Sequence, residues 1–148
     1  MSQRTTLTGQ VLAPGEASGV ALVLSDSLSL WGGMDPASGL VIDAHHPQRG
    51  TRVTGRVLVM ASARGSSSSS SILAESIRAG TAPAAILLGD LDLILPIGAA
   101  VAEELYAHAM PIVVLTPEAL QTIPDGAELT ICQGGQISVN AVGHSATS

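Results

Sequence analysis

The chain has 148 residues, of which 46% are hydrophobic and 12% are charged, and its formal net charge is −6. This composition fits one folded domain and holds too few charges for a disordered segment. No Lys/Arg cluster is present and no apolar run reaches the length of a membrane span, so we expect neither nucleic acid nor a membrane as a partner.

The core must be aliphatic, because Phe is absent and the chain has one Trp and one Tyr. Such cores suit sheets covered by helices. The only cysteine is Cys132, so an internal disulfide is impossible. The N-terminus, MSQRTTLTGQ, lacks the apolar region of a secretory signal, and a cytoplasmic location is therefore expected. Cys132 ends a strand-like run, where we expect a small buried hydrophobic residue rather than a ligand or nucleophile.

The first part of the chain predicts two strands, Leu7–Leu12 and Gly19–Leu24, separated by the turn sequence APGEASG. The segment Ser27–Thr51 follows, rich in Gly, Pro and Asp, with one short apolar run at Leu40–Ile42. A loop of this length in a compact domain is either functional or disordered. The lone Trp31 argues against disorder.

The second part alternates strands and helices. RVLVMA, PAAILL and PIVVL are continuous aliphatic runs, as expected for strands buried on both faces. SILAESIRAG has helical spacing and ends on Gly80, a typical helix stop. A second helix is predicted where Ile97, Val101, Leu105 and His108 share one face.

The C-terminal part predicts a short helix and a hairpin. TPEALQTI has Thr116 as N-cap and Pro117 at the first helical position, and AELTI and QISV form a hairpin around CQGGQ. Strand–helix–strand crossovers join parallel strands, whereas the two ends of the chain contribute antiparallel ones. The fold class is mixed α/β: one domain, residues 1–148, with a small sheet or barrel flanked by helices.

Six serines, Ser66–Ser71, separate the run RVLVMA from the helix that follows. Ligands of α/β sheets bind at the carboxyl ends of strands, beside helix N-termini that favour anions. Gly65 lets the backbone approach a ligand, serine hydroxyls add donors, and Arg64 could hold a carboxylate through two bonds. The alternatives are a flexible linker or a simple N-cap. Position favours a substrate-binding turn, since a linker would not join a strand to its covering helix.

Several motifs in this order resemble one family. With WGGMDP, HHP, RGSS and APAAI in this order, the chain resembles, over roughly Gly9–Ile131, the small subunit, or swivel domain, of the aconitase X enzymes. The resemblance implies a swivelling β/β/α barrel that docks on a large subunit and is inactive alone. It also implies that this partner holds most of the active site and, in several members, an iron–sulfur cluster. One cysteine could not hold a cluster, so we expect no cofactor or metal on this chain.

The resemblance also implies a reaction and a site. Family members are hydro-lyases, among them dehydratases of cis-3-hydroxy-L-proline and of mevalonate 5-phosphate. The first serine of the Gly-Ser-Ser turn, Ser66, corresponds to a catalytic base. Gly65, Ser67, Ser68 and Arg64 are expected to bind the substrate, with Ser68 at the position where aconitase proper has an arginine. The Ala-rich, Lys-free composition favours cis-3-hydroxy-L-proline over mevalonate 5-phosphate. A non-enzymatic module that binds a small anion is the alternative from another class.

Three further residue types have two interpretations each. Asp35 either faces the same substrate site or serves as a turn carboxylate beside Pro36. His45 and His46 are adjacent, so their side chains point in opposite directions on an extended chain, which favours a structural role over metal binding. Trp31 is expected to anchor the long loop or to belong to the subunit interface.

Overall fold

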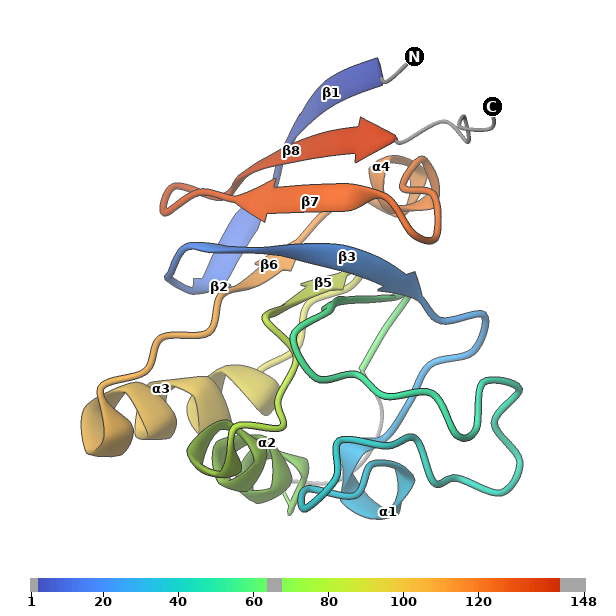
Figure 1. Ribbon diagram of the computed structural model, residues 1–148. Helices are drawn as coiled ribbons and strands as arrows, with labels where there is room; N and C mark the ends of the chain where they lie inside the picture. The colour runs from blue at the N-terminus through green and yellow to red at the C-terminus, as the bar shows by residue number, and fades with distance from the viewer. Residues whose placement is uncertain (1–2, 64–67, 142–148) are drawn as a thin grey trace.

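The protein is described by a computed structural model that covers residues 3–63 and 68–141 (Figure 1). The strands are β1 (Gln3–Thr8), β2 (Gln10–Ala13), β3 (Ala17–Val23), β4 (Val57–Met60), β5 (Ala85–Leu88), β6 (Ile112–Val114), β7 (Glu128–Ile131) and β8 (Gln136–Ala141). The helices are α1 (Leu30–Gly33), α2 (Ser68–Ala79), α3 (Leu95–Tyr106) and α4 (Pro117–Gln121). No helix among the described residues is both long and apolar enough to cross a membrane.

The strands form one mixed sheet in the order β1-β8-β7-β3-β4-β5-β6-β2. β3, β4, β5 and β6 are parallel, whereas β7, β8, β1 and β2 pair antiparallel with their neighbours. The strands at the two ends of this order, β1 and β2, are joined by a single residue, Gly9. The sheet therefore curls back on itself as a barrel, with α1, α2 and α3 on one side of its parallel part (Figure 1).

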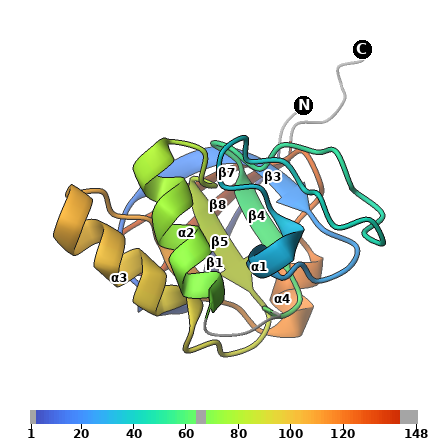
Figure 2. The ribbon, with the colours of Figure 1, turned by 90° about the horizontal axis from the view of Figure 1, so that it is seen from below.

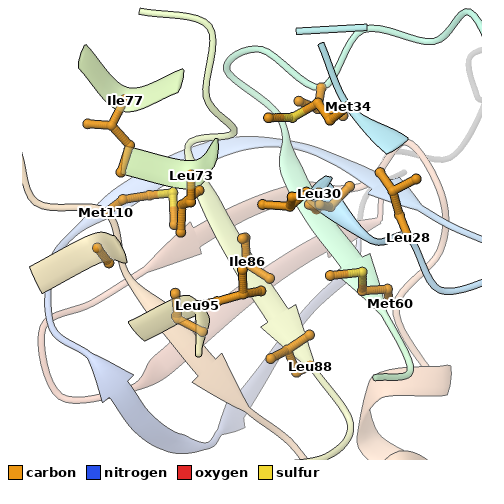
Figure 3. Close-up of a cluster of buried hydrophobic side chains, with 14 of the residues drawn as sticks. Leu28, Leu30, Met34, Met60, Leu73, Ile77, Ile86, Leu88, Leu95 and Met110 are labelled. Atoms are coloured by element: carbon orange, nitrogen blue, oxygen red, sulfur yellow. The ribbon is translucent and has the colours of Figure 1, made fainter. Parts of the chain in front are cut away.

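Two apolar cores lie on the two faces of the parallel strands. Along β4 the side chains alternate, as pleated strands require. Leu58 and Met60 belong to an outer core beneath α2 and α3, whereas Val57 and Val59 belong to an inner core inside the barrel. Figure 3 shows the outer core, with Leu73 of α2 among its residues. This double burial explains why the parallel strands read as unbroken aliphatic runs.

The predicted first strand, Leu7–Leu12, is wrong in its boundaries. The chain forms two strands that break at Gly9, whose N–H donates to Gly135 O (3.0 Å). A Cβ on Gly9 would lie 2.5 Å from the carbonyl oxygen of Val114. The turn therefore depends on a tertiary contact that the local pattern does not reveal.

The other predicted strands and the C-terminal elements are confirmed, with ends that differ by at most two residues. The Thr116 side chain accepts from Ala119 N–H and caps α4, and Pro117 is its first residue. β7 and β8 form the predicted hairpin. Leu120 of α4 and Ile123 beyond it cover part of the inner core.

The helix after β4 begins earlier than its apolar spacing indicates. α2 starts at Ser68, so that Ser68–Ser71 is helical, and Ser69 is buried. The linker interpretation is therefore wrong for these four serines. Ser66 and Ser67 lie outside the described residues, as do Arg64 and Gly65.

α3 contains the predicted face but does not bury it. Its buried residues are Leu95, Gly98, Ala99 and Ala102, whereas Ile97, Val101 and Leu105 are exposed. Figure 2 shows α3, α2 and α1 across the same side of the parallel strands. The helix thus packs through its small residues and presents its large apolar residues outward.

Cys132 is exposed, which corrects the expectation of a buried residue. The alternation of β7 gives the reason: Leu129 and Ile131 are buried, whereas Glu128 and Thr130 are exposed. Cys132 continues this alternation on the outer face, where the hairpin turn begins.

Candidate functional site

The carboxyl ends of the four parallel strands meet at one edge of the sheet. The connections that follow β3, β4, β5 and β6 therefore lie at this edge, which we call the carboxyl edge. In α/β sheets this is where ligands bind, because the loops and the helix N-termini converge there. The 64–67 segment belongs to the connection between β4 and α2.

Two serines join the connections that follow β3 and β4. The hydroxyls of Ser27 and Ser62 lie 3.2 Å apart, and Ser62 N–H donates to Ser27 Oγ (3.3 Å). Both side chains are half-buried. The chain that leads from β4 toward the serine run is therefore held at its start by polar contacts.

The connection between β5 and α3 brings two carboxylates to the same edge. Gly89 N–H donates to Ala61 O (3.0 Å), which continues the pairing of β4 with β5. Asp92 Oδ2 accepts from the N–H groups of Ile94 (3.1 Å) and Leu95 (2.7 Å), and so fixes the start of α3. Asp90 is exposed, and its Oδ1 accepts from the N–H of the next residue.

A hollow of about 340 Å³ opens at this edge, between the ends of β4 and β5 and helix α4. Asp90 is the one ionisable side chain of its described lining, and no basic side chain contributes. The lining consists of Ala61, Ser62, Gly89, Asp90, Pro117, Leu120 and Gln121. The hollow is thus mixed in polarity and borders the connection that carries the serine run.

The first turn of α2 also lies against α1. Trp31 N–H donates to the buried Ser69 hydroxyl (3.4 Å). Ser68 begins the helix and is half-buried. Among the expected site residues Ser68 is therefore placed at a helix N-terminus, where backbone N–H groups favour an anion. The other four residues of the predicted turn, 64–67, cannot be placed from the described residues.

Asp35 has the turn role that was one of its two interpretations. Its Oδ1 accepts from Ala37 N–H (3.0 Å) and its Oδ2 from the Ser38 hydroxyl (2.8 Å). The neighbouring Pro36 carbonyl accepts from Thr81 Oγ1 (2.6 Å), beyond the C-terminal end of α2. Asp35 therefore lies toward the opposite end of α2 from the serine run.

The histidine pair is divided as the sequence indicated. His46 is buried, its Nε2 lies 2.8 Å from Asp26 O, and its Nδ1 accepts from Gln48 N–H (3.0 Å). His45 is exposed. Within residues 3–63 and 68–141 no group of three or more His, Cys, Asp or Glu side chains could hold a metal ion.

A somewhat larger hollow, of about 380 Å³, lies at the opposite edge of the sheet. Its lining includes Glu16, Gly80 and His108, so it faces the C-terminal end of α2. Helix C-termini present carbonyl oxygens and repel anions. The hollow at the carboxyl edge, where ligands of α/β sheets bind, is therefore the better candidate site.

Comparison with known proteins identifies this arrangement. A family model described as the aconitase X swivel domain matches residues 6–139. The chain belongs to the aconitase X swivel-domain family. The predicted swivelling β/β/α barrel of this swivel domain is confirmed.

Curated relatives of the swivel domain carry two different names. The chain is 47% identical to cis-3-hydroxy-L-proline dehydratase from Pseudomonas aeruginosa over 115 residues, which are 78% of this chain and 20% of that protein. It is 35% identical to the phosphomevalonate dehydratase small subunit from Methanopyrus kandleri, over 80% of this chain and 84% of that one. The chain therefore spans about a fifth of the length of the first relative.

A solved structure has the same architecture as this swivel domain. Thermococcus kodakaraensis aconitase X in its holo-form superposes with a TM-score of 0.81 and 26% sequence identity. The match covers 91% of this chain and 98% of that one. The order of strands and helices is therefore shared over almost the whole described chain.

Sequence reasoning missed the polar residues that surround the serine run. Ser62 and Asp90 each follow a parallel strand within two residues, and Ser27 follows β3 within four. A rule that polar residues just after buried strands gather at one edge would have found Ser62 and Asp90. The contact between Ser27 and Ser62 depends on the pairing of β3 with β4, which the local pattern did not show.

Of the two roles expected of Trp31, the structure excludes one, and the other stays a prediction. Its side chain is 58% exposed, so it does not anchor the long loop in the core. The loop is held by other contacts, among them those of His46. A role for Trp31 in a subunit interface is compatible with this exposure.

Proposed function

We propose that this chain is the small subunit of an aconitase X-type dehydratase that acts on cis-3-hydroxy-L-proline together with a large subunit. The observation that supports the proposal most is that the connection between β4 and α2, which carries the serine run in the sequence, starts with Ala61 and Ser62 in the lining of the hollow of about 340 Å³ at the carboxyl edge. Family membership supports the reaction class, because the relatives are named dehydratases.

Dehydration of a 3-hydroxy acid needs a base and a way to expel hydroxide. The base removes the proton from the carbon next to the carboxylate, a double bond forms, and the hydroxyl leaves as water after it gains a proton. In this proposal Ser66 is the base. A serine alkoxide must be held by donors and shielded from water. Gly65, Ser67, Ser68 and Arg64, beside the first amides of α2, would bind the carboxylate.

The large subunit would supply the remaining groups. An iron–sulfur cluster, if the reaction uses one to draw off the hydroxyl, would have to be held there, because this chain has a single cysteine and that residue is exposed on the outer side of the β7–β8 hairpin. The small subunit alone is then inactive.

The substrate is the finer part of the proposal. The described lining of the hollow holds the carboxylate of Asp90 and no basic side chain, which suits a substrate with an ammonium group better than one with a phosphate. The identity of 47% to a cis-3-hydroxy-L-proline dehydratase favours the same choice. Mevalonate 5-phosphate is the second candidate, since the small-subunit relatives match over most of their own length.

The test is to pair the purified chain with the large subunit from the same organism and assay both substrates. Ser66→Ala should lower turnover by about 10²–10⁴-fold, as expected for loss of a general base. Ser18→Ala is the control, since Ser18 is an exposed serine on β3 near the opposite edge. Both variants should still associate with the large subunit.

Two results would contradict the proposal. Full activity of the Ser66→Ala pair would remove Ser66 from its role as base. A stable solitary chain that binds a small anion and recruits no large subunit would favour the alternative of a non-enzymatic binding module.

A further inference from the structure

Large apolar side chains are concentrated on one part of the surface. Nine of them are exposed in the described part of the chain, and six lie in a single stretch that runs from the end of β5 to the end of α3. These six are Leu91, Leu93, Ile97, Val101, Leu105 and Tyr106, with exposed fractions between 40% and 71%. Exposed large apolar side chains gathered on one segment indicate an interaction site.

Four of these residues follow one another at intervals of four: Leu93, Ile97, Val101 and Leu105. The last three share one side of α3, and Leu93 lies two residues before the helix begins. We call these four residues the apolar stripe. Their spacing is that of a buried helix face, yet the stripe lies on the outside of the molecule.

The helix cannot turn to bury the stripe, because a close backbone contact fixes it. A Cβ on Gly98 would lie 2.4 Å from the carbonyl oxygen of Ser70 on α2. Ala99 and Ala102 complete the small-residue face that packs inward. α3 is therefore held against α2 by its smallest side chains, and the stripe stays available to a second molecule.

A groove of about 220 Å³ runs between α2 and α3 beside the stripe. Ile97, Val101 and Tyr106 line it on α3, and Ala74 and Glu75 line it on α2. Arg78 forms an ion pair with Glu75, and its hydrogen bond lowers the pKa of the Glu75 carboxyl below its usual value. The groove thus has an apolar wall and a charged rim.

We infer that the apolar stripe is the docking surface for the large dehydratase chain, the counterpart of the four-fifths of the cis-3-hydroxy-L-proline dehydratases that this chain does not match. The inference rests on the proposed function and adds the place where the partner binds. The stripe is close to the candidate site along the chain, because it begins at Leu93, three residues after Asp90, which lines the hollow. A partner that completes the site from the carboxyl edge therefore meets the stripe as well.

Trp31 extends the same surface across α2. It lies on α1, whose backbone contacts the first turn of α2 through Ser69, and its side chain is exposed. Figure 2 shows α2 between α3 and α1. A partner that reaches from the stripe to Trp31 passes over the N-terminal end of α2, into which the serine run leads. An interface of ordinary size, about 800 Å² on each partner, is large enough for this.

The charged residue beside the stripe indicates which side chains the partner surface must have. Glu104 lies beside the stripe on α3 and is exposed. A matching surface is therefore apolar at its centre, with Lys or Arg at its rim. A second copy of this chain does not fit, since a two-fold contact through the stripe would bring the glutamates of both copies together.

The experiment compares the same substitution, Val to Lys, at two positions. Val101 on the stripe and Val20 on β3 are 40% and 41% exposed, and each is replaced by Lys. Val20 pairs across the sheet with Glu128, so that Lys is tolerated there. The tagged wild type, Val101→Lys and Val20→Lys are purified from the source organism. Circular dichroism melts confirm that all three fold, and mass spectrometry identifies the chains that co-purify with them.

The expected partner is a chain whose sequence matches the remaining part of the cis-3-hydroxy-L-proline dehydratases. Wild type and Val20→Lys should recover this chain together with dehydratase activity. Val101→Lys should recover at least about tenfold less of it, because the Lys ammonium would be buried among apolar groups of the interface. Equal recovery with Val101→Lys overturns the docking surface and leaves the proposed function standing. Absence of such a chain from the wild-type preparation overturns both. A dimer of this chain that Val101→Lys abolishes, without a large partner, assigns the stripe to self-association and overturns the inference.

Discussion

At the scale of single residues, His46 shows how the long loop is held. The imidazole is buried and connects two parts of the chain, with Nε2 directed at Asp26 O and Nδ1 accepting from Gln48 N–H. Gln48 in turn contacts Ser25 N–H and Val23 O at the end of β3. His46 is therefore a structural residue that keeps this connection against the carboxyl edge.

His46→Ala should lower the free energy of unfolding by about 1–3 kcal/mol, since two hydrogen bonds at about 0.5–1.5 kcal/mol each are lost. His45→Ala is the matched control, because the neighbouring imidazole is exposed and its loss should cost less than about 0.5 kcal/mol. Urea unfolding followed by circular dichroism measures both. Equal values for the two variants would mean that the His46 contacts contribute nothing.

Single residues also mark the limit of local patterns. The adjacency of His45 and His46 was enough to predict opposite orientations, and the alternation of β7 could have predicted that Cys132 faces outward. For Asp35 the sequence left two roles open. The contact of Pro36 with Thr81, 45 positions away, was needed to place Asp35 away from the serine run. A contact between residues so far apart in the sequence cannot be predicted from a local pattern.

At the scale of elements, apolar periodicity identified α3 but not the side that it buries. Ile97, Val101 and Leu105 have helical spacing, yet the burial follows Gly98, Ala99 and Ala102. Hydrophobicity ranks the face of large side chains as the interior one, whereas close helix packing prefers small ones. Only the contact with α2 decides between these two, and it is a tertiary one.

Gly98→Ala tests that contact through the sign of the change in the free energy of unfolding. At an exposed helix position the higher helix propensity of Ala would stabilise the protein by about 1 kcal/mol. Here the new Cβ would meet the Ser70 backbone, and we expect a net destabilisation of about 1–3 kcal/mol. Ala100→Gly, at an exposed position of the same helix, should cost about 1 kcal/mol from propensity alone. Thermal and urea unfolding compare the two, and stabilisation by Gly98→Ala would show that the helices are not in close contact.

The residue at which α2 begins could not be predicted from the local sequence either. Serine is a modest helix former, so a serine run predicts a cap or a loop more readily than a first turn. Ser69 is nevertheless helical and buried, with its hydroxyl in contact with Trp31 N–H. Tertiary contacts with α1 compensate for weak propensity at the helix start that borders the candidate site.

At the scale of the whole molecule, the closure of the sheet is the feature that no segment reveals. Strand types and the parallel crossovers were readable from the sequence, and they led to a small sheet or barrel. The strand order could not be predicted from the sequence, because β1 and β2 pair with strands about a hundred or more positions away. The direct pairing of the four parallel strands creates the carboxyl edge where the candidate site lies, and β2 and β7 pair with the two outermost of these strands, β6 and β3.

Gly9 is the residue through which this closure is tested. Any side chain there would meet Val114 O at 2.5 Å, and the Gly9 N–H bond to Gly135 O would be strained. Gly9→Ala should therefore lower the free energy of unfolding by about 1–3 kcal/mol. Gly134→Ala, in the nearby β7–β8 hairpin turn, is the control because a Cβ there meets nothing within 4 Å. Amide hydrogen exchange distinguishes a local effect from a global one. If the barrel unfolds as one unit, protection falls in β5 as well as beside Gly9, whereas an effect confined to β1 and β2 would mean that closure does not stabilise the parallel strands.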